Sequence, residues 1–116
     1  MNNIGVDLVK VDRFEKNKSN NTFMNNIFNE KELEYIKKKN YNNQTIAGLF
    51  AAKEAFLKAI KKGINDYSLK DVEIFHNDDG APLINLHNEL DKLYGNKIIS
   101  LSISHDGEYA VATVLI

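Results

Sequence analysis

The 116-residue sequence contains no cysteine, a single arginine and no long apolar run. The lack of cysteine excludes disulfides, thiol catalysis and thiolate metal sites, and it fits a reducing compartment. A membrane-spanning helix needs about 18 consecutive apolar residues, so we expect no membrane partner. Residues Met1–Asn3 lead directly into an apolar strand pattern instead of forming a signal peptide. A cytoplasmic location is therefore predicted.

An excess of charge of either sign is also absent, because the formal net charge at pH 7 is −1. Such a chain has no general attraction for nucleic acid or an anionic membrane, so any basic site must be local. A glycine-rich phosphate loop, an HExxH pair and a GxSxG turn are missing, which excludes the common nucleotide-binding, metalloprotease and serine hydrolase signatures. With 43% hydrophobic residues, residues 1–116 are predicted to form one domain.

The most informative stretch is residues 45–60, TIAGLFAAKEAFLKAI, whose apolar spacing predicts a helix. One face carries large apolar side chains together with Lys53. Glu54 and Lys58 lie four residues apart along one edge, where a simple ion pair would contribute roughly 0.2–0.5 kcal/mol. The opposite face is made of small residues and would let a backbone, a neighbouring subunit or a ligand come close: Ala47, Gly48, Ala51, Ala52, Ala55 and Ala59.

A further charge in apolar surroundings is Asp7, within the strand pattern Ile4–Val9. Alternation places Asp7 beside Gly5 on one face of this strand. A carboxylate there is costly unless it is paired, hydrogen-bonded or holding a metal ion. Packing of the strand on the helix could bring Asp7 and Glu54 together, which favours a site over a simple Glu54–Lys58 pair.

The first half of the chain predicts other helices around the central one. Asp12 and Asn29 each precede a glutamate by three residues, which is the spacing of a capping box at a helix start. Residues 17–26 are rich in Asn, Ser and Thr, so we expect a loop there. Gly63 is expected to end the central helix in a left-handed cap.

The second half of the chain changes to strand patterns. Four segments are predicted as strands, with one helix between the second and the third: strands at about 71–76, 83–85, 97–105 and 109–115, and the helix at 87–94. Asp106–Gly107 is expected to form a two-residue hairpin turn directly after His105. We therefore predict an α+β fold in which an antiparallel sheet packs on a long central helix.

Five segments, taken together and in order, resemble the bacterial holo-[acyl-carrier-protein] synthases, the short branch of the 4'-phosphopantetheinyl transferases: Gly5–Val9, Phe50–Ala59, Asp71–Ile74, Gly80–Pro82 and Ser102–His105. The resemblance covers almost the whole chain and implies the fold of that family. It implies Mg²⁺-dependent transfer of 4'-phosphopantetheine from coenzyme A to a serine of apo acyl carrier protein, which releases adenosine 3',5'-bisphosphate and serves fatty acid and lipid biosynthesis. It also implies a homotrimer with active sites between subunits.

The same resemblance implies roles for individual residues. Asp7 and Glu54 match the metal-binding positions, and Lys58 would face the pyrophosphate and stabilise or protonate the leaving phosphate. Arg13 matches the position that docks the acidic recognition helix of the carrier protein. The resemblance gives Lys53 no defined role. The positions that it places at the substrate are Lys53, Lys62, Gly63, Gly80, Pro82, Ser104 and His105.

Several alternatives stay open at this point. The base that takes the serine proton could be Glu54 or a metal-bound water. Leu49 stands where many members of the family have arginine, and Lys61–Gly63 replaces a common Gly-Thr-Gly, so the affinity for coenzyme A is open. A catalytically silent module that binds an acidic protein, or another Mg²⁺-dependent phosphate enzyme, would also account for these charges.

Overall fold

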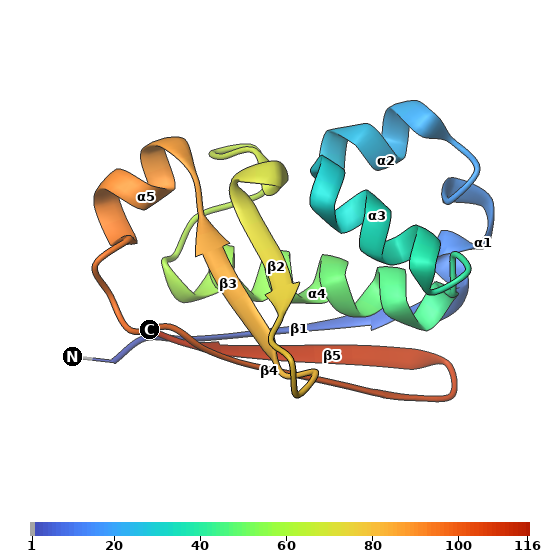
Figure 1. Ribbon diagram of the computed structural model, residues 1–116. Helices are drawn as coiled ribbons and strands as arrows, with labels where there is room; N and C mark the ends of the chain where they lie inside the picture. The colour runs from blue at the N-terminus through green and yellow to red at the C-terminus, as the bar shows by residue number, and fades with distance from the viewer. Residues whose placement is uncertain (1) are drawn as a thin grey trace.

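The computed structural model describes residues 2–116, in which helices and strands surround one long helix, α4 (Asn43–Ala59) (Figure 1). None of the helices in this range is long and apolar enough to cross a membrane. In chain order the other elements are β1 (Ile4–Lys10), the 3-10 turn η1 (Val11–Arg13), α1 (Phe14–Asn17), α2 (Asn21–Ile27), α3 (Glu30–Lys38), η2 (Leu69–Asp71), β2 (Val72–His76), β3 (Pro82–Leu86), α5 (Asn88–Tyr94), β4 (Ser100–Asp106) and β5 (Tyr109–Leu115).

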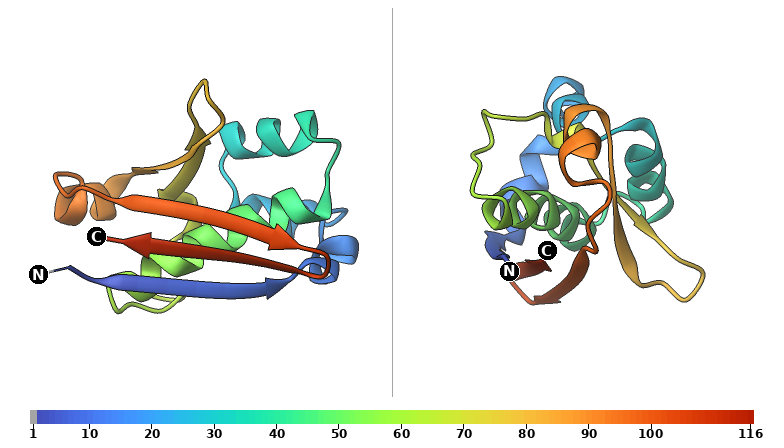
Figure 2. Two further views of the ribbon diagram at one scale, coloured as in Figure 1. Left: turned by 90° about the horizontal axis from the view of Figure 1, so that it is seen from below. Right: turned by 90° about the vertical axis from the view of Figure 1, so that its left-hand side faces the viewer.

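The main sheet is antiparallel throughout, with β5 between β1 and β4, and Figure 2 shows α4 lying across one face of it. Asp7 of β1 pairs with Ala112 of β5, which pairs in turn with Ile103 of β4. Strands β2 and β3 form a separate antiparallel hairpin, whose tip projects away from the body of the molecule (Figure 2). The predicted α+β fold, an antiparallel sheet on a long central helix, is confirmed.

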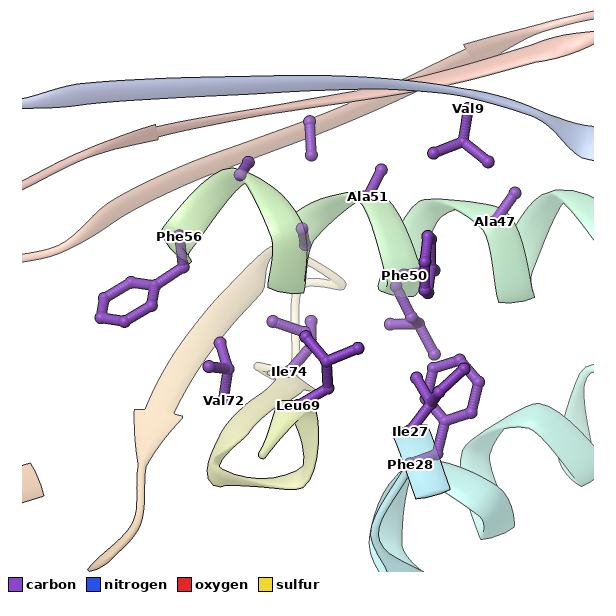
Figure 3. Close-up of a cluster of buried hydrophobic side chains, with 14 of the residues drawn as sticks. Val9, Ile27, Phe28, Ala47, Phe50, Ala51, Phe56, Leu69, Val72 and Ile74 are labelled. Carbon is purple, nitrogen blue, oxygen red and sulfur yellow. The ribbon is translucent and has the colours of Figure 1, made fainter. Parts of the chain in front are cut away.

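The small-residue face of α4 packs on the chain's own sheet. In Figure 3, Ala47 and Ala51 point from the helix toward the strands, and Val9 points back at them. Gly5 permits the closest approach, because a Cβ at this position would collide with the carbonyl oxygen of Ala55. The sequence left open whether a backbone, a neighbouring subunit or a ligand covers this face. In the structure it is the backbone of β1, and the small side chains are buried against it.

The opposite face of α4 carries large side chains that hold the remaining elements. Phe50 packs edge-on against Phe14 of α1, with the ring centroids 5.3 Å apart. Each such side chain contributes about 1.5–3 kcal/mol when it is fully buried, so α4 is fixed from both sides. The other large side chains that gather under this face in Figure 3 come from the end of α2, from η2 and from β2: Ile27, Phe28, Leu69, Val72 and Ile74.

Two local predictions near the N-terminus are wrong. Residues 17–26 do not form a loop, because α2 occupies most of this segment. The Asn20 side chain caps α2 by accepting a hydrogen bond from the Phe23 N–H at 3.1 Å, and Met24 is buried in the core. Asp12 caps no helix with its side chain, since the chain leaves β1 through the tight η1 turn.

Two turn predictions are displaced by one or two residues. The left-handed residue after α4 is Lys61, with φ of +63°, and not Gly63. The hairpin between β4 and β5 turns at residues 107–108, because Asp106 still pairs with Tyr109 inside the ladder. Both shifts leave the predicted elements in place, since turn chemistry locates an element's end only approximately.

Candidate active site

Asp7 and Lys58 form an ion pair between β1 and α4. The alternation of β1 turns the Asp7 side chain toward α4, where it is buried, whereas the Lys58 side chain is 55% exposed. Lys58 Nζ donates a hydrogen bond to Asp7 Oδ1 at 2.9 Å. Among residues 2–116 no salt bridge joins Lys58 to Glu54, so the simple pair along the helix is not formed. We call Asp7, Glu54 and Lys58 the carboxylate corner.

The carboxylate of Asp7 affects the pKa of Glu54 in this corner. Burial and the nearby charge of Asp7 raise the pKa of Glu54 to about 7, although Arg13 and Lys58 oppose the rise. Asp7 Oδ2 is buried and receives no hydrogen bond from residues 2–116. Two ionised carboxylates cannot donate to each other, so a proton on Glu54 or a cation is needed to satisfy both groups.

The donors of the carboxylate corner suit a magnesium ion. Mg²⁺ is a hard cation that one or two carboxylates hold together with waters and substrate phosphates. Asp7 offers its unsatisfied Oδ2, and Glu54 offers a half-buried carboxyl group close by. Within residues 2–116 no group of three or more His, Cys, Asp or Glu side chains is placed to hold a metal. Two carboxylates alone fit an ion that keeps coordination positions open for phosphate.

A hollow of about 220 Å³ opens at the carboxylate corner. Glu54 and Lys58 line it from α4, and Lys62 and Gly63 line it from the loop that follows. Four of the predicted site residues thus lie around one space. The Gly63 N–H is engaged within the chain, since it donates to Asp66 Oδ2 at 2.6 Å. Positive charge in this hollow therefore comes from Lys58 and Lys62.

The residues predicted at the nucleotide lie in another place. Gly80, Pro82 and His105 line a hollow of about 370 Å³, which we call the hairpin hollow, between the α3–α4 turn, the β2–β3 hairpin and β4. Ser104 does not line it and lies instead with Leu8 along a smaller hollow over the sheet. The hairpin hollow and the hollow at the carboxylate corner have no lining residue in common. One copy of the chain therefore does not bring all the predicted site residues together.

The hairpin hollow also contains residues that the sequence analysis did not single out. Lys39 follows α3, and His76 ends β2, and both line this space. In the sequence Lys39 is the last of three consecutive lysines, which are common at the end of a helix, and His76 only ends a strand pattern. No local signal distinguishes such residues from ordinary surface positions.

Lys53 was predicted at the substrate, but the structure buries it in the core. Its side chain is 0% exposed, and Glu32, its partner, is equally buried. Glu32 also accepts from the N–H of Ile74 and from that of Asn29, which confirms the predicted capping box at Asn29. All three ammonium protons of Lys53 are used, so its role is structural. Nζ donates to Glu32 Oε1 at 2.7 Å and to the carbonyl oxygens of Leu69 and Val72 at 2.8 Å each.

Arg13 lies at the edge of the carboxylate corner. It belongs to η1 and is exposed, and its guanidinium carbon is 4.9 Å from the centroid of the Phe50 ring. Its charge lowers the pKa of Glu54 against the larger effects of burial and of Asp7. The single arginine of the chain is thus positioned on the surface directly beside the candidate site.

Known proteins similar to this chain define its family. A sequence model of the 4'-phosphopantetheinyl transferase superfamily matches residues 3–114. This chain belongs to that superfamily. The holo-[acyl-carrier-protein] synthase of Caldicellulosiruptor saccharolyticus is 45% identical, over 97% of this chain and 94% of the relative. The synthase of Fusobacterium nucleatum is 43% identical, over 97% of this chain and 96% of the relative.

Solved structures of phosphopantetheinyl transferases have the same fold as this chain. The Helicobacter pylori holo-[acyl-carrier-protein] synthase, in complex with coenzyme A, matches with a TM-score of 0.84 and 36% identity over 96% of both chains. The Bacillus anthracis synthase, in complex with CoA (3',5'-ADP), gives a TM-score of 0.81 and 36% identity, over 97% of this chain and 93% of that one. The resemblance drawn from the sequence motifs is confirmed.

Proposed function

We propose that this chain is a holo-[acyl-carrier-protein] synthase, which transfers 4'-phosphopantetheine from coenzyme A to a serine of apo acyl carrier protein and releases adenosine 3',5'-bisphosphate. The observation that carries the proposal is the carboxylate corner, where an unsatisfied, buried oxygen of Asp7 lies beside Glu54 and Lys58. Relatives that bear this name cover nearly the whole chain, with identities of 40–46%. The hairpin hollow, lined by His105 and Pro82, has room for the nucleotide end of coenzyme A.

The chemistry requires charge to be collected around a diphosphate and a serine hydroxyl to be placed in line with it. Asp7 and Glu54 would hold Mg²⁺, which when bound supplies positive charge to the diphosphate oxygens. Lys58 reaches the corner from an exposed position, so its ammonium can donate a proton or a hydrogen bond to the departing phosphate. Glu54 is the chain's own candidate for the base that takes the serine proton.

We further propose a homotrimer whose active sites lie between subunits. The outer face of β1 is apolar and open, with exposures of 68% at Ile4, 54% at Val6 and 64% at Leu8. A row of large apolar side chains on a sheet favours a protein interface over water. Because the carboxylate corner and the hairpin hollow have no lining residue in common, a neighbouring copy could supply its hairpin hollow to this chain's corner.

The remaining proposed substrate contacts are divided between the carboxylate corner and the nucleotide site around the hairpin hollow. At the carboxylate corner Arg13 is proposed to dock the acidic carrier protein, because an exposed cation at the rim steers an oppositely charged partner. The other proposed contacts are Lys62 and Gly63 at the diphosphate, and Gly80, Pro82, Ser104 and His105 at the nucleotide. The cytoplasmic location and the organisation of residues 1–116 as one domain stay predictions.

Intact-mass spectrometry tests the transferase directly. Apo acyl carrier protein incubated with this chain, coenzyme A and Mg²⁺ should gain the mass of one phosphopantetheine group, and EDTA should prevent the gain. A carrier protein whose acceptor serine is replaced by alanine is the matched control. Nucleotide turnover without any mass gain would favour another Mg²⁺-dependent phosphate enzyme. Absence of turnover, of mass gain and of coenzyme A binding would favour a silent module that binds an acidic protein.

A further inference from the structure

The chain leaves α4 through residues 60–68, a segment that contains no helix or strand (Figure 1). Two of its residues, Lys62 and Gly63, line the hollow at the carboxylate corner. All of residues 61–66 are exposed. An exposed lysine on a free loop must lose conformational freedom when it binds a ligand, and this loss weakens binding. The way in which the segment is fixed therefore decides how well Lys62 can serve the hollow.

The helix α4 ends in a Schellman motif that has lysine where glycine is usual. The Lys62 N–H donates to the carbonyl oxygen of Leu57 at 2.8 Å. The Lys61 N–H donates to that of Lys58 at 3.0 Å, which completes the motif. The motif needs one left-handed residue, and Lys61 supplies it with φ of +63°. A side chain disfavours this conformation, so it persists only where the surrounding structure holds it.

Asp66 closes the turn that follows this motif. The Gly63 N–H donates to Asp66 Oδ2 at 2.6 Å, and the Asp66 N–H donates back to the carbonyl oxygen of Gly63 at 3.1 Å. Two residues three apart thus bind each other in both directions, as the residues of a capping box do. A hydrogen bond to a carboxylate is stronger than one between neutral groups. We call this reciprocal pair the Gly63–Asp66 clamp.

The carboxylate of Asp66 is directed at the main chain and not at the hollow. Asp66 does not line the hollow, and it forms no salt bridge within residues 2–116. Gly63 is not in the left-handed region, and a Cβ there would only contact Asp66 Oδ2 at an ordinary 3.5 Å. The clamp therefore depends on the Asp66 side chain and not on a conformation that only glycine can adopt.

We propose that Asp66 is a positioning residue, whose clamp on Gly63 holds Lys62 over the hollow so that the Lys62 ammonium meets the diphosphate of coenzyme A. This inference rests on the proposed function, which supplies the diphosphate. The Schellman motif fixes the main chain before Lys62, and the clamp fixes it from the next residue onward. The clamp also keeps the chain from leaving α4 in another direction, which offsets the unfavourable conformation of Lys61. Asp66 itself touches no substrate and acts through Lys62.

Calorimetry with coenzyme A tests this role on the whole protein. Asp66→Ala removes the acceptor of the clamp and should weaken binding about fivefold, because Lys62 must then be ordered on binding. Asp66→Asn keeps an oxygen acceptor and should stay within about twofold of the wild-type protein. Asn65→Ala changes the exposed neighbour, is the matched control and should have no effect.

Three results of this calorimetry would overturn the proposal. They are an unchanged affinity in Asp66→Ala, an equal loss in Asp66→Asn, and an equal loss in Asn65→Ala. A gain of affinity in Asp66→Ala would also overturn it, because Asp66 would then compete with the diphosphate for the Gly63 N–H instead of positioning Lys62.

Two double variants test the route by which Asp66 acts. Lys62→Met should weaken coenzyme A binding about tenfold, and adding Asp66→Ala should cause no further loss, because no lysine is left to position. Additive losses would contradict the proposal. Lys61→Gly allows the left-handed conformation without cost, so Asp66→Ala in this background should weaken binding by about twofold at most. An undiminished loss there would contradict the role of the clamp at Lys61.

Transfer kinetics separate this role from a general structural effect and from the proposed function. In Asp66→Ala the KM for coenzyme A should rise, whereas kcat, the KM for the carrier protein and the urea midpoint should not change. A fall in kcat or in the urea midpoint would indicate a structural effect and would contradict the proposal. If the wild-type protein binds coenzyme A but transfers nothing, the proposed function fails, and the affinities still decide the role of Asp66. If it binds no coenzyme A, both proposals fail.

Discussion

Lys53 and Lys58 are close neighbours on α4 and each pairs with a carboxylate, yet the two pairs have opposite surroundings. Lys53 and Glu32 are fully buried at 2.7 Å, and every ammonium proton has an acceptor. Lys58 and Asp7 approach to 2.9 Å, but the lysine is mostly exposed and Asp7 Oδ2 has no donor within residues 2–116. The first pair is closed, and the second is open.

This difference separates a structural pair from a functional one more clearly than residue type does. Burying a charge costs several kcal/mol unless its hydrogen bonds are complete, and the closed pair meets that condition with no capacity left for a ligand. The open pair retains an unsatisfied oxygen, an exposed ammonium and, at Glu54, a carboxyl group with a pKa of about 7. Of the two pairs, only the open one therefore retains polar groups that are free to bind a cation and a phosphate.

The largest effect is expected from removing one of the two carboxylates of the carboxylate corner. Asp7→Asn and Glu54→Gln retain the size of the side chain but remove a carboxylate that would hold Mg²⁺. Each should lower kcat/KM for carrier-protein labelling by on the order of 10³-fold or more, because several kcal/mol of transition-state stabilisation is lost. Time courses by intact-mass spectrometry measure this loss.

The stability of these variants provides their control. Because the Lys58 side of the ion pair is exposed, Asp7→Asn should change the free energy of unfolding by no more than about 1 kcal/mol. Undiminished labelling by Asp7→Asn or Glu54→Gln would refute the metal assignment. It would also mean that the Lys58–Asp7 pair, like the Lys53–Glu32 pair, has no role in catalysis.

The closed pair should respond in stability. Lys53→Met leaves the Glu32 carboxylate buried without its cation and should lower the free energy of unfolding by about 3–5 kcal/mol. Adding Glu32→Gln removes the buried charge and keeps an acceptor for the Ile74 N–H, so the double variant should recover most of the loss. Urea unfolding followed by circular dichroism measures both values.

Lys58→Met makes the same substitution at the open pair and is the matched control. Its effect on unfolding should stay below about 1 kcal/mol, because the lysine is exposed. An equal loss of stability in Lys53→Met and Lys58→Met would contradict the division into a closed and an open pair.

Glu54, beside the open pair, should also affect the pH dependence of the stability of the metal-free protein. The pKa of Glu54 is about 7 in the folded state against an ordinary value of 4.5, so the folded chain binds a proton that the unfolded chain releases. This stabilisation is complete below pH 4.5 and is lost as the pH rises through about 7. Urea midpoints in EDTA should reflect this loss, and Glu54→Gln should abolish it. The same pH profile in both proteins would assign the effect to other groups.

Much of this arrangement could be predicted from local patterns. The alternation of Ile4–Val9 placed Asp7 and Gly5 together on one face of the strand, and the structure packs this face on α4. The split of α4 into small and large faces predicted that both sides are covered, and the motif segments identified the family. These features depend on periodicity within one element, which sequence reasoning captures well.

The pairing of charges across the fold could not be predicted in the same way. Lys53 finds Glu32 at a separation of 21 residues, and Lys58 prefers Asp7 to Glu54, its neighbour on the helix. The helix α2 was missed because polar residues hide the cap at Asn20. The hairpin hollow exists only where the α3–α4 turn meets the β2–β3 hairpin and β4, so no local pattern reveals it. Each of these depends on tertiary packing.

The smallest effect is expected at Arg13, which extends the open pair to the surface. Arg13→Ala should raise the KM for the carrier protein about two- to fivefold and leave that for coenzyme A unchanged, because an exposed charge contributes little to a docked complex. The effect should shrink as salt is added, since exposed charges are screened. Lys97→Ala, which also removes an exposed positive charge, is the control and should change neither value. A rise in the KM for coenzyme A alone would place Arg13 at the nucleotide and not at the carrier protein.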